Sequence, residues 1–561
     1  MIKSILIFFV SMFCAVNICF SQADNIPLDN GVYQFLKNMS VKHVIGSIND
    51  QDPVLSRMQV EEYLDEIEDN YDELSYVERR LLKKYQVELI FYEQTEKNTT
   101  VLIDGDGKFS ERAGDIFSDK QKYLYRYERG KSNLSFDLLG RAEYINTIKP
   151  NTKLNGKILE VGFRGYGTFF GHLGYSLMVR AAGVWGDRGV LTNAESWLRY
   201  NYKYNELTDE FGSYTIVNGY TRYQTEPGKN MLLAIEIGKE RIKTGYSYDQ
   251  SLVISDNGPE MDFIKFNYNW GIMRFNSYTA STVGPFVQDR SKNYTKFIAA
   301  NQIVFSIPKV FDIGIGEQEV YSGRGLDIGY LTPFGFYKYL EQDLQDRDNG
   351  TFYLTFQTNF IKNLQFNGTA YLDENFIGKL NDFSLATNKV AFQVGAMTYA
   401  PFGLDNLSLQ FAYTYIRPYV YSHINPQNSI TGFGTILGNE IGPNGDRIFT
   451  RLSYYFSEKI KFDLTYAHSR KGNNIYDAQG NLIKNVGGDV FLGYNIDTDN
   501  KYAPFLDGEQ VNTDNIAATL RIEPIRGFVF DINYTYNYSN NLYKKIKSDN
   551  SFAFMRLLLD Y

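Results

Sequence analysis

The feature that most constrains the fold is an alternation of apolar and polar residues over about ten positions, repeated many times along the chain. One example is KIKFDLTYAH, where the apolar set is Ile460, Phe462, Leu464 and Tyr466 and the polar set is Lys461, Asp463 and Thr465. NLSLQFAYTY and GFVFDINYTYNY show the same pattern. Successive side chains of a strand point to opposite faces, so each stretch predicts a strand with one apolar and one wet face. About ten residues is also the length at which a tilted strand crosses a bilayer.

The final stretch, SFAFMRLLLDY, carries the same alternation to its last residue. Its apolar face consists of Ala553, Met555, Leu557, Leu559 and Tyr561. Chain ends are normally poorly ordered, and a disordered end does not need an apolar face. We therefore predict that this strand pairs with the first strand to close a barrel, which leaves no free sheet edge and turns the apolar face to lipid.

The connections between these stretches alternate between short and long. Short turns are predicted near Pro308, Lys362, Asp405, Glu458 and Pro524, and long polar connections at 331–350, 418–446 and 470–512. Short periplasmic turns and long external loops are typical of outer-membrane barrels. The predicted fold is mainly β, a transmembrane antiparallel β-barrel of about eighteen strands. The alternation is indistinct between 225 and 293, so the orientation of the strands there stays open.

The first 21 residues read as a signal peptide. Lys3 precedes an apolar run, and small residues lead to a predicted cleavage between Ser21 and Gln22. A membrane anchor is the alternative, although Asn17 interrupts the apolar run. Both cysteines, Cys14 and Cys19, lie in this segment. The predicted mature chain therefore has no disulfide, no thiol nucleophile and no cysteine metal site.

Residues 22–98 follow a helical period instead. Val32, Phe35, Leu36 and Met39 fall on one face of a helix. The segments SRMQ and SYVE, which begin at Ser56 and at residue 75, match capping boxes at helix starts. We predict a small helical domain of about three helices over 22–98, with the barrel spanning 99–561.

Composition agrees with this interpretation. The chain has 45 Tyr and 41 Phe, which suits a barrel with aromatic girdles at both lipid interfaces. Its formal net charge of −8 argues against nucleic acid as a partner. No later stretch has the roughly 18–20 consecutive apolar residues of a membrane helix. We predict a location in the outer membrane with the helical domain in the periplasm; a soluble, secreted β-rich protein is the alternative.

Signals for enzymatic chemistry are weak. The four histidines, His43, His172, His423 and His468, are far apart and none lies in a metal-binding motif. The segment DGDG at 104–107 is predicted to be a turn rather than a calcium loop, because Lys108 occupies the next ligand position. We predict no catalytic residue, no metal and no cofactor. A barrel hydrolase, which would need a serine near a histidine at one rim, stays open.

Two of the predicted long loops have a composition suited to sugars. YVYSHINPQNS and GNEIGPNGD mix aromatic residues with amides and carboxylates. Aromatic rings can stack on the apolar faces of sugars while amides and carboxylates bind hydroxyls. The candidate glycan contacts are Tyr419, Tyr421, His423 and Asn425. External loops are polar in any case, so this composition has an ordinary explanation too.

Three stretches resemble the capsule-assembly outer-membrane family of the Wzi type. The first is the N-terminal opening from NIPLDNGVYQF to SRMQV. The second is IGKERIKTGYSYDQSLVISDNGPEMDFIKF, whose matching residues are Gly238, Glu240, Arg241, Gly245, Ser251, Leu252, Ser255, Asn257 and Pro259. The third is IGIGEQEVYSGRGLDIGYLTPFGFY, with Gly316, Glu317, Tyr321 and Pro333. One departure is that TGYSY stands where the family pattern leads us to expect Trp.

The resemblance implies a periplasmic helical bundle attached to a barrel of about eighteen strands. It also implies a lectin-like role without catalysis, in which the protein holds capsular or exopolysaccharide at the outer surface. The partners would be surface polysaccharide, outer-membrane lipid and other capsule export proteins. We expect the motif from Gly238 to Pro259 to shape or plug the barrel, or simply to fold an inward loop. A porin or substrate-specific outer-membrane channel is the alternative function.

Overall fold

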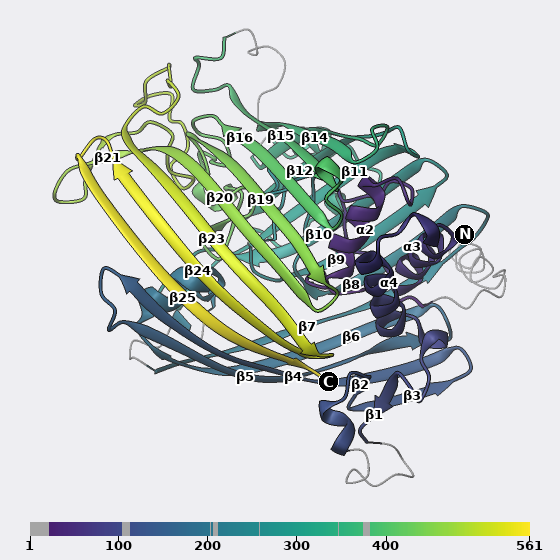
Figure 1. Cartoon of the computed structure of the whole chain (residues 1–561). Helices are drawn as coiled ribbons and strands as arrows, with labels where there is room; N and C mark the ends of the chain where they lie inside the picture. Colours follow the sequence, from purple (N-terminus) through teal and green to yellow (C-terminus); the bar gives the residue numbers. More distant parts are fainter. Residues whose placement is uncertain are drawn as a thin grey trace, which may run out of the picture.

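The computed structural model describes residues 22–103, 113–201, 204–205, 211–256, 258–345, 347–373 and 382–561. Within these residues, eighteen long antiparallel strands form one closed barrel (Figure 1), as the sequence pattern predicts. The strands are β4 (Ser132–Lys149), β5 (Asn155–Phe169), β6 (Leu173–Gly186), β7 (Phe211–Thr225), β8 (Met231–Glu240), β9 (Met261–Trp270), β10 (Met273–Val283), β11 (Thr295–Ile307), β12 (Phe311–Ser322), β13 (Asn349–Thr358), β14 (Leu364–Asp373), β15 (Lys389–Tyr399), β16 (Leu407–Ile416), β19 (Gly445–Ser457), β20 (Ile460–Asn473), β23 (Glu509–Ile525), β24 (Phe528–Asn541) and β25 (Ile546–Asp560).

Pairing of β25 with β4 closes the barrel, with Asp560 opposite Leu139. A short strand, β3 (Tyr125–Arg129), then pairs with the beginning of β4 on the same edge. The predicted closure by the last strand is therefore confirmed.

The two faces of the strands are also as predicted. On the outer wall, Leu464 and Met555 are exposed, as lipid-facing side chains should be. On the inner wall, Lys461 and Asp463 form an ion pair at 3.0 Å, and Arg556 of β25 pairs with Glu143 of β4 at 2.7 Å. The mixed face of SFAFMRLLLDY therefore points into the lumen.

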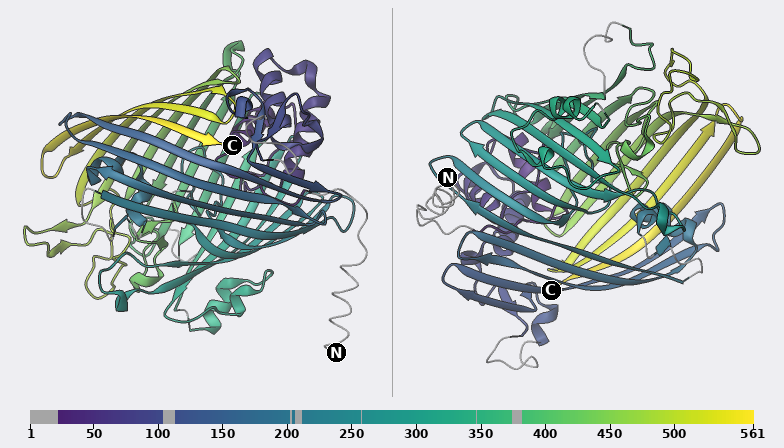
Figure 2. Two further views of the ribbon diagram at one scale, coloured as in Figure 1. Left: turned by 90° about the horizontal axis from the view of Figure 1, so that it is seen from below. Right: turned by 180° about the vertical axis from the view of Figure 1, so that it is seen from behind.

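Short and long connections gather at opposite ends of the barrel, the short-turn end and the long-loop end (Figure 2). All five predicted short turns lie at the short-turn end. The structure also resolves the orientation left open in the sequence. The turns at 226–230 and 271–272 belong to the short-turn end, whereas the connections at 241–260 and 284–294 belong to the long-loop end.

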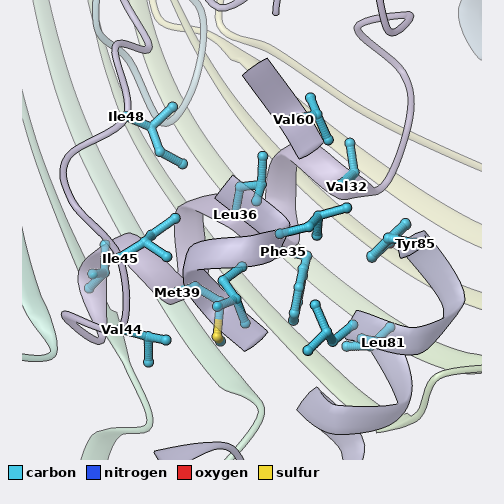
Figure 3. Close-up of a cluster of buried hydrophobic side chains, with 14 of the residues drawn as sticks. Val32, Phe35, Leu36, Met39, Val44, Ile45, Ile48, Val60, Leu81 and Tyr85 are labelled. Carbon is cyan, nitrogen blue, oxygen red and sulfur yellow. The ribbon is translucent and has the colours of Figure 1, made fainter. Parts of the chain in front are cut away.

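The N-terminal region forms a helical bundle of α2 (Val32–Val41), α3 (Arg57–Asp69) and α4 (Tyr76–Leu89). Both predicted capping boxes are present, at the starts of α3 and α4. The bundle core, drawn in Figure 3, includes Phe35, Leu36 and Met39. The same core continues into the barrel through Tyr399 of β15 and Tyr455 of β19, so the bundle is docked in the short-turn end rather than tethered beside it.

Domain boundaries remain predictions. A 3-10 turn, η2 (Phe91–Glu93), follows α4. A two-stranded sheet of β1 (Thr99–Val101) and β2 (Gln121–Tyr123) then precedes the barrel, with the 3-10 helix η3 (Ala113–Phe117) between its strands. The predicted signal peptide and the DGDG segment lie outside the described residues. None of the described helices combines the length and apolar character needed to span a bilayer.

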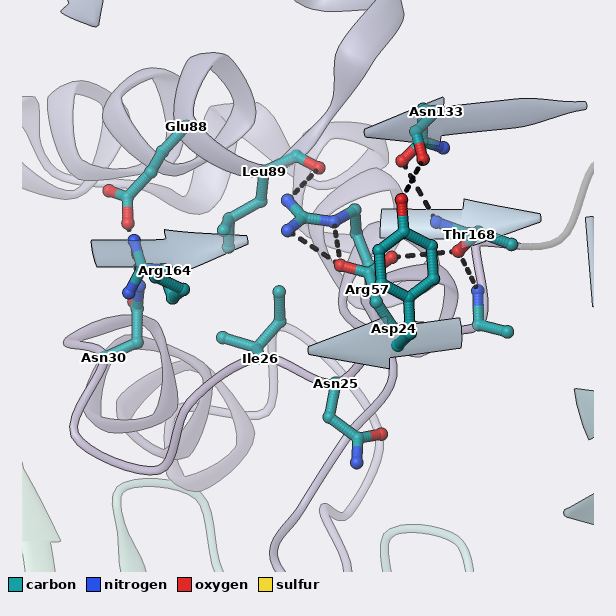
Figure 4. Close-up of polar contacts among 12 residues, drawn as sticks. Asp24, Asn25, Ile26, Asn30, Arg57, Glu88, Leu89, Asn133, Arg164 and Thr168 are labelled. Atoms are coloured by element: carbon teal, nitrogen blue, oxygen red, sulfur yellow. Dashed lines mark hydrogen bonds and ion pairs between the residues drawn. The ribbon is translucent and has the colours of Figure 1, made fainter. Parts of the chain in front are cut away.

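Buried polar contacts anchor the segment before α2 to the barrel wall (Figure 4). The Asp24 carboxylate accepts hydrogen bonds from Arg57 Nε at 3.0 Å and from the Thr168 hydroxyl at 3.1 Å. Arg57 also donates to the Leu89 carbonyl at 3.1 Å. One carboxylate thus connects α3 and the end of α4 to β5.

A second anchor is Asp52, which precedes α3. Its carboxylate accepts from Lys265 Nζ at 2.5 Å and from Asn267 Nδ2 at 2.8 Å, and Asn276 also donates to it. These partners come from β9 and β10. Asp52 and Lys265 are both buried and form an ion pair with each other.

The barrel interior is filled unevenly. Along β9–β16, the filled side, inward residues such as Ala300, Tyr353 and Tyr371 are buried beneath the bundle and the loops. Along β4–β6, β19, β20 and β23–β25, the open side, a cavity of about 640 Å³ remains between the wall and the N-terminal segment. On β23 no residue at all is buried, so both faces of that strand are accessible.

Candidate functional site

The connection between β8 and β9, residues 241–260, folds into the barrel as an inward loop. It carries most of the motif residues that resemble the capsule-assembly family. The Gly245 amide donates to the Gln51 carbonyl of the bundle at 2.9 Å, and the Tyr248 hydroxyl donates to Gln365 of β14 at 2.8 Å. The loop therefore reaches from the long-loop end down to the bundle, as expected for a segment that plugs the lumen.

Ser251 and Gly245 shape the turn of this loop. The Ser251 hydroxyl donates to the Thr244 carbonyl at 2.6 Å and accepts from the Val253 amide at 3.1 Å. Gly245 has a φ of 101°, and a Cβ there would lie 2.4 Å from Ser251 Oγ. Both the backbone angle and the close approach therefore require glycine at this position.

The far end of the inward loop joins the connection between β16 and β19, residues 417–444. The Ser255 hydroxyl donates to the Gly438 carbonyl at 2.9 Å. The Leu252 carbonyl accepts from the Tyr421 hydroxyl at 2.7 Å. Leu252 and Tyr421 belong to one buried cluster, so the two loops share a core inside the barrel.

The remaining motif residues lie at the edges of the inward loop. Gly238 packs on Tyr220 of the neighbouring strand, Glu240 ends β8, and Pro259 is buried before β9. Arg241 and Glu260 form an ion pair at 3.5 Å across the base of the loop. Asn257 lies outside the described residues. These contacts are structural, and a role of the motif in binding stays a prediction.

One carboxylate of the inward loop is held in a distinctive environment. The Asp249 side chain is 6% exposed and pairs with Arg447 of β19 at 2.8 Å. Burial raises the pKa of Asp249, while the Arg447 guanidinium opposes that rise. The ion pair ties the loop to the wall where β19 begins.

The four candidate glycan contacts differ in their exposure to solvent. Tyr419 and Tyr421 are completely buried, His423 is buried, and Asn425 is exposed. Tyr419 packs edge-on against Tyr494 of the connection between β20 and β23. In this arrangement neither tyrosine ring presents a face on which a sugar could stack. Their burial was not predictable from the loop sequence, because their partners lie far away in the chain.

Tyr419 instead supports an exposed ledge made of residues 382–388 and 501–503. The Ala386 amide donates to the Lys501 carbonyl and the Ala503 amide to the Ser384 carbonyl, both at 2.9 Å. Ala386 and Ala503 pack on Tyr419 beneath the ledge. On its surface, Phe383 and Tyr502 are each about half exposed. We did not identify this pair from the sequence; the signal available was one aromatic residue in each of two polar loops.

The third family-like stretch forms the end of β12 and a flap, residues 323–345, that folds over the outside of the barrel. Glu317 points outward and accepts from the Tyr337 amide at 2.9 Å and from Asn301 Nδ2 at 3.0 Å. Phe334 of the flap stacks on Phe275 of β10. The Tyr321 hydroxyl accepts from the Asp327 amide of the flap at 3.2 Å. Glu317 and Tyr321 therefore have a structural role in attaching the flap to the wall.

Three of the four histidines make hydrogen bonds within the described residues. His468 contacts Asp514 at 2.9 Å, His172 contacts the Gln224 carbonyl at 3.1 Å, and His423 contacts the backbone of Asn425. None of these contacts is a serine–histidine pair. In the part of the chain that the structure describes, no group of three or more His, Cys, Asp or Glu residues is arranged to hold a metal ion.

No family model and no curated protein matches the chain. Among solved structures, the chain is similar to Wzi, an outer-membrane protein involved in group 1 capsule assembly in Escherichia coli and described as a carbohydrate-binding β-barrel. The TM-score is 0.52 at 12% identity, over 96% of this chain and 99% of that one. OprD from Pseudomonas aeruginosa matches with a TM-score of 0.40 at 12% identity, over 76% of this chain and 94% of that one. The likeness to Wzi establishes that the two chains share a fold, as the sequence resemblance implies.

Proposed function

We propose that this protein is an outer-membrane barrel that holds a surface polysaccharide in a lectin-like manner during capsule or exopolysaccharide assembly. In this proposal the long-loop end faces outward and the bundle faces the periplasm. The observation that carries it is the ledge at the long-loop end, where Phe383 and Tyr502 are exposed on a buried support. Exposed aromatic rings on a buried support are suited to stacking on sugars. The fold shared with Wzi, a carbohydrate-binding barrel, also supports a carbohydrate ligand.

The test is binding of the producing organism's own surface polysaccharide to the purified protein in detergent. We expect saturable binding that falls at least about fivefold when Phe383 and Tyr502 are both changed to Ala, since stacked aromatic pairs contribute about 0.5–1.5 kcal/mol each beyond the area they bury. Tyr543→Ala is the matched control, because Tyr543 is similarly exposed in the short connection between β24 and β25. Unchanged binding by the double variant would place the carbohydrate elsewhere.

A cellular experiment tests the assembly role itself. Deletion of the gene should release polysaccharide from the cell surface into the medium, and the ledge variant should do so in part. Normal retention of surface polysaccharide in the deletion strain would contradict the assembly role. Participation of other capsule export proteins stays a prediction.

The cavity on the open side favours a channel as the second candidate function. A channel would give steady ion conductance in planar bilayers and no saturable polysaccharide binding. The filled side argues for the lectin role, because the inward loop and the bundle occupy the lumen along β9–β16. The conductance measurement therefore decides between the two candidates.

A further inference from the structure

The lining of the cavity on the open side contains more basic than acidic side chains. It carries eleven Lys and Arg side chains against six Asp and Glu side chains. Part of this lining is visible in Figure 4, where Arg164 lies near the bundle. Its volume of about 640 Å³ is within the range of small-molecule sites. A cavity of this size and charge is suited to a ligand that carries anionic oxygens.

Two cations of the lining have like-charged neighbours. Lys461 of β20 lies directly opposite Arg521 of β23 in the sheet register. Like charges directly opposite each other destabilise a sheet. Lys461 pairs with Asp463, and Arg521 donates to Asp531 through Nε and Nη2. Neither carboxylate is part of the lining, so these two cations border the cavity while their partners lie behind it.

Other cations of the lining retain unused hydrogen-bonding capacity. Arg451 lies over the Phe449 ring at 5.1 Å, and among the described side chains no carboxylate pairs with it. Arg180 has Glu160 at 3.7 Å, but its Nε is buried with no hydrogen-bond partner among the described residues. A guanidinium provides five donors in a planar fork that matches carboxylate and phosphate oxygens.

An outer pocket adjoins the cavity at the short-turn end, along a seam between α4 and the barrel turns. This pocket of about 290 Å³ shares Lys84, Glu458 and Arg526 with the cavity lining. Ion pairs of Lys84 with Glu523 and of Arg80 with Glu458 cross the seam. Such pairs near a surface contribute little stability.

We propose that this cavity is a binding site for a short acidic saccharide or another small ligand with carboxylate or phosphate oxygens, which enters at the seam. Arg451 and Arg180 hold the anionic oxygens, and Arg521 and Lys461 add further positive charge. The site lies at the opposite end from the ledge and does not depend on the proposed surface role.

The first test is calorimetric titration of the full mature protein in detergent with trigalacturonate, inorganic phosphate and neutral maltotriose. We expect saturable binding of trigalacturonate and none of maltotriose. Arg451→Gln should weaken trigalacturonate binding at least about tenfold, because it removes a charge-assisted hydrogen bond without leaving a carboxylate alone. Arg129→Gln, an exposed arginine on β3 outside the cavity, is the matched control and should bind as the wild type does.

A competition experiment between trigalacturonate and phosphate tests whether the site recognises the sugar or only its anionic oxygens. Displacement of trigalacturonate by millimolar phosphate indicates that the site recognises anionic oxygens alone; tight trigalacturonate binding that phosphate does not displace indicates that the sugar contributes. Either result supports an anion site. Equal binding of the neutral and acidic saccharides, or unchanged affinity in Arg451→Gln, would overturn the proposal.

A second test needs no change to the charged residues. Ser176 of β6 lines the cavity, and the predicted mature chain has no cysteine, so Ser176→Cys would provide a single thiol. A negatively charged thiosulfonate reagent should label it at least about tenfold faster than a positively charged one, because the cavity concentrates anions. Trigalacturonate should slow the labelling. Faster labelling by the cationic reagent, or no protection by the saccharide, would contradict the proposal.

Discussion

The inner wall of the barrel is covered by the bundle and the loops on the filled side, and borders a cavity on the open side. On the filled side, inward residues from β9–β16 contact the bundle and the loops, and charges such as Asp52 and Lys265 are buried together. On the open side, inward charges such as Arg521 and Lys461 border a cavity. The filled side thus gives the molecule a fixed interior, while the open side retains space and charge for a ligand.

The difference follows from the lengths of the connections. The inward loop and the connection at 417–444 both emerge on the filled side, and together they build a core inside the barrel. On the open side, the connections between β4 and β5 and between β24 and β25 are short. A short connection cannot reach the lumen. The N-terminal segment and the connection between β6 and β7 cover part of that wall. The long connection between β20 and β23 instead packs towards the filled side, where Val490 joins the cluster of Leu252 and Tyr421.

The largest expected effect comes from breaking the buried charge pair on the filled side. Asp52→Ala leaves Lys265 buried without its partner and should cost about 3–5 kcal/mol of the free energy that holds the bundle in the barrel. Limited proteolysis should then cleave the bundle while the barrel stays intact. Asp549→Ala is the control, because its pair with Lys149 at 3.2 Å is exposed. A bundle that resists protease in Asp52→Ala would contradict this anchor.

Two alanine substitutions compare the sides directly. Ala300 on β11 and Ala517 on β23 both point inward, but Ala300 is buried and Ala517 is half-exposed. Ala300→Leu should destabilise the protein by about 1–3 kcal/mol through overpacking. Ala517→Leu should change stability by less than about 0.5 kcal/mol, since the added atoms enter open space. Urea unfolding of both purified variants in detergent measures the difference, and equal losses would mean that the two walls are equally packed.

A smaller effect is expected within the inward loop. Ser251→Ala removes the hydroxyl contacts with Thr244 and Val253 and should destabilise the loop by about 1 kcal/mol. Amide hydrogen exchange should accelerate over residues 244–254 and stay unchanged in the bundle. The half-exposed Ser539 on β24 provides the matched control, Ser539→Ala, which should leave exchange unchanged. Unaltered exchange in Ser251→Ala would mean that other contacts fix the loop.

The smallest effect on stability is expected at the seam. Lys84→Gln removes the ion pair with Glu523 and should cost less than about 1 kcal/mol, the usual range for pairs near a surface. Thermal unfolding of the purified protein is the measurement, and Lys83→Gln, which breaks the exposed pair with Glu93, is the control. A loss of several kcal/mol in Lys84→Gln would show that the seam is a major contact between bundle and barrel.

Sequence reasoning succeeded where the physics is local. The alternation in KIKFDLTYAH predicted which face of β20 meets the lumen, because side-chain direction along a strand has a fixed period. The capping boxes predicted the starts of α3 and α4, because the required residues lie three positions apart. Barrel closure followed from the apolar face of the last strand.

The interior could not be predicted in the same way. Tyr421 looks like a loop aromatic in the sequence, and its burial depends on Leu252, which is remote in the chain. Arg451, Lys461 and Arg521 lie on separate strands, and the closed barrel brings them to one cavity. Long-range contacts decide both outcomes, and a periodic pattern carries no information about them.

Closure of the barrel through β25 and β4 has a consequence for the order of folding. The residues in this pair are separated by most of the chain, so joining them carries a large loop-closure entropy and should occur late. The bundle precedes β4 in the chain and is anchored within the short-turn end by Asp24 and Asp52. The wall can therefore assemble around a bundle that is already folded, with the bundle acting as an internal template.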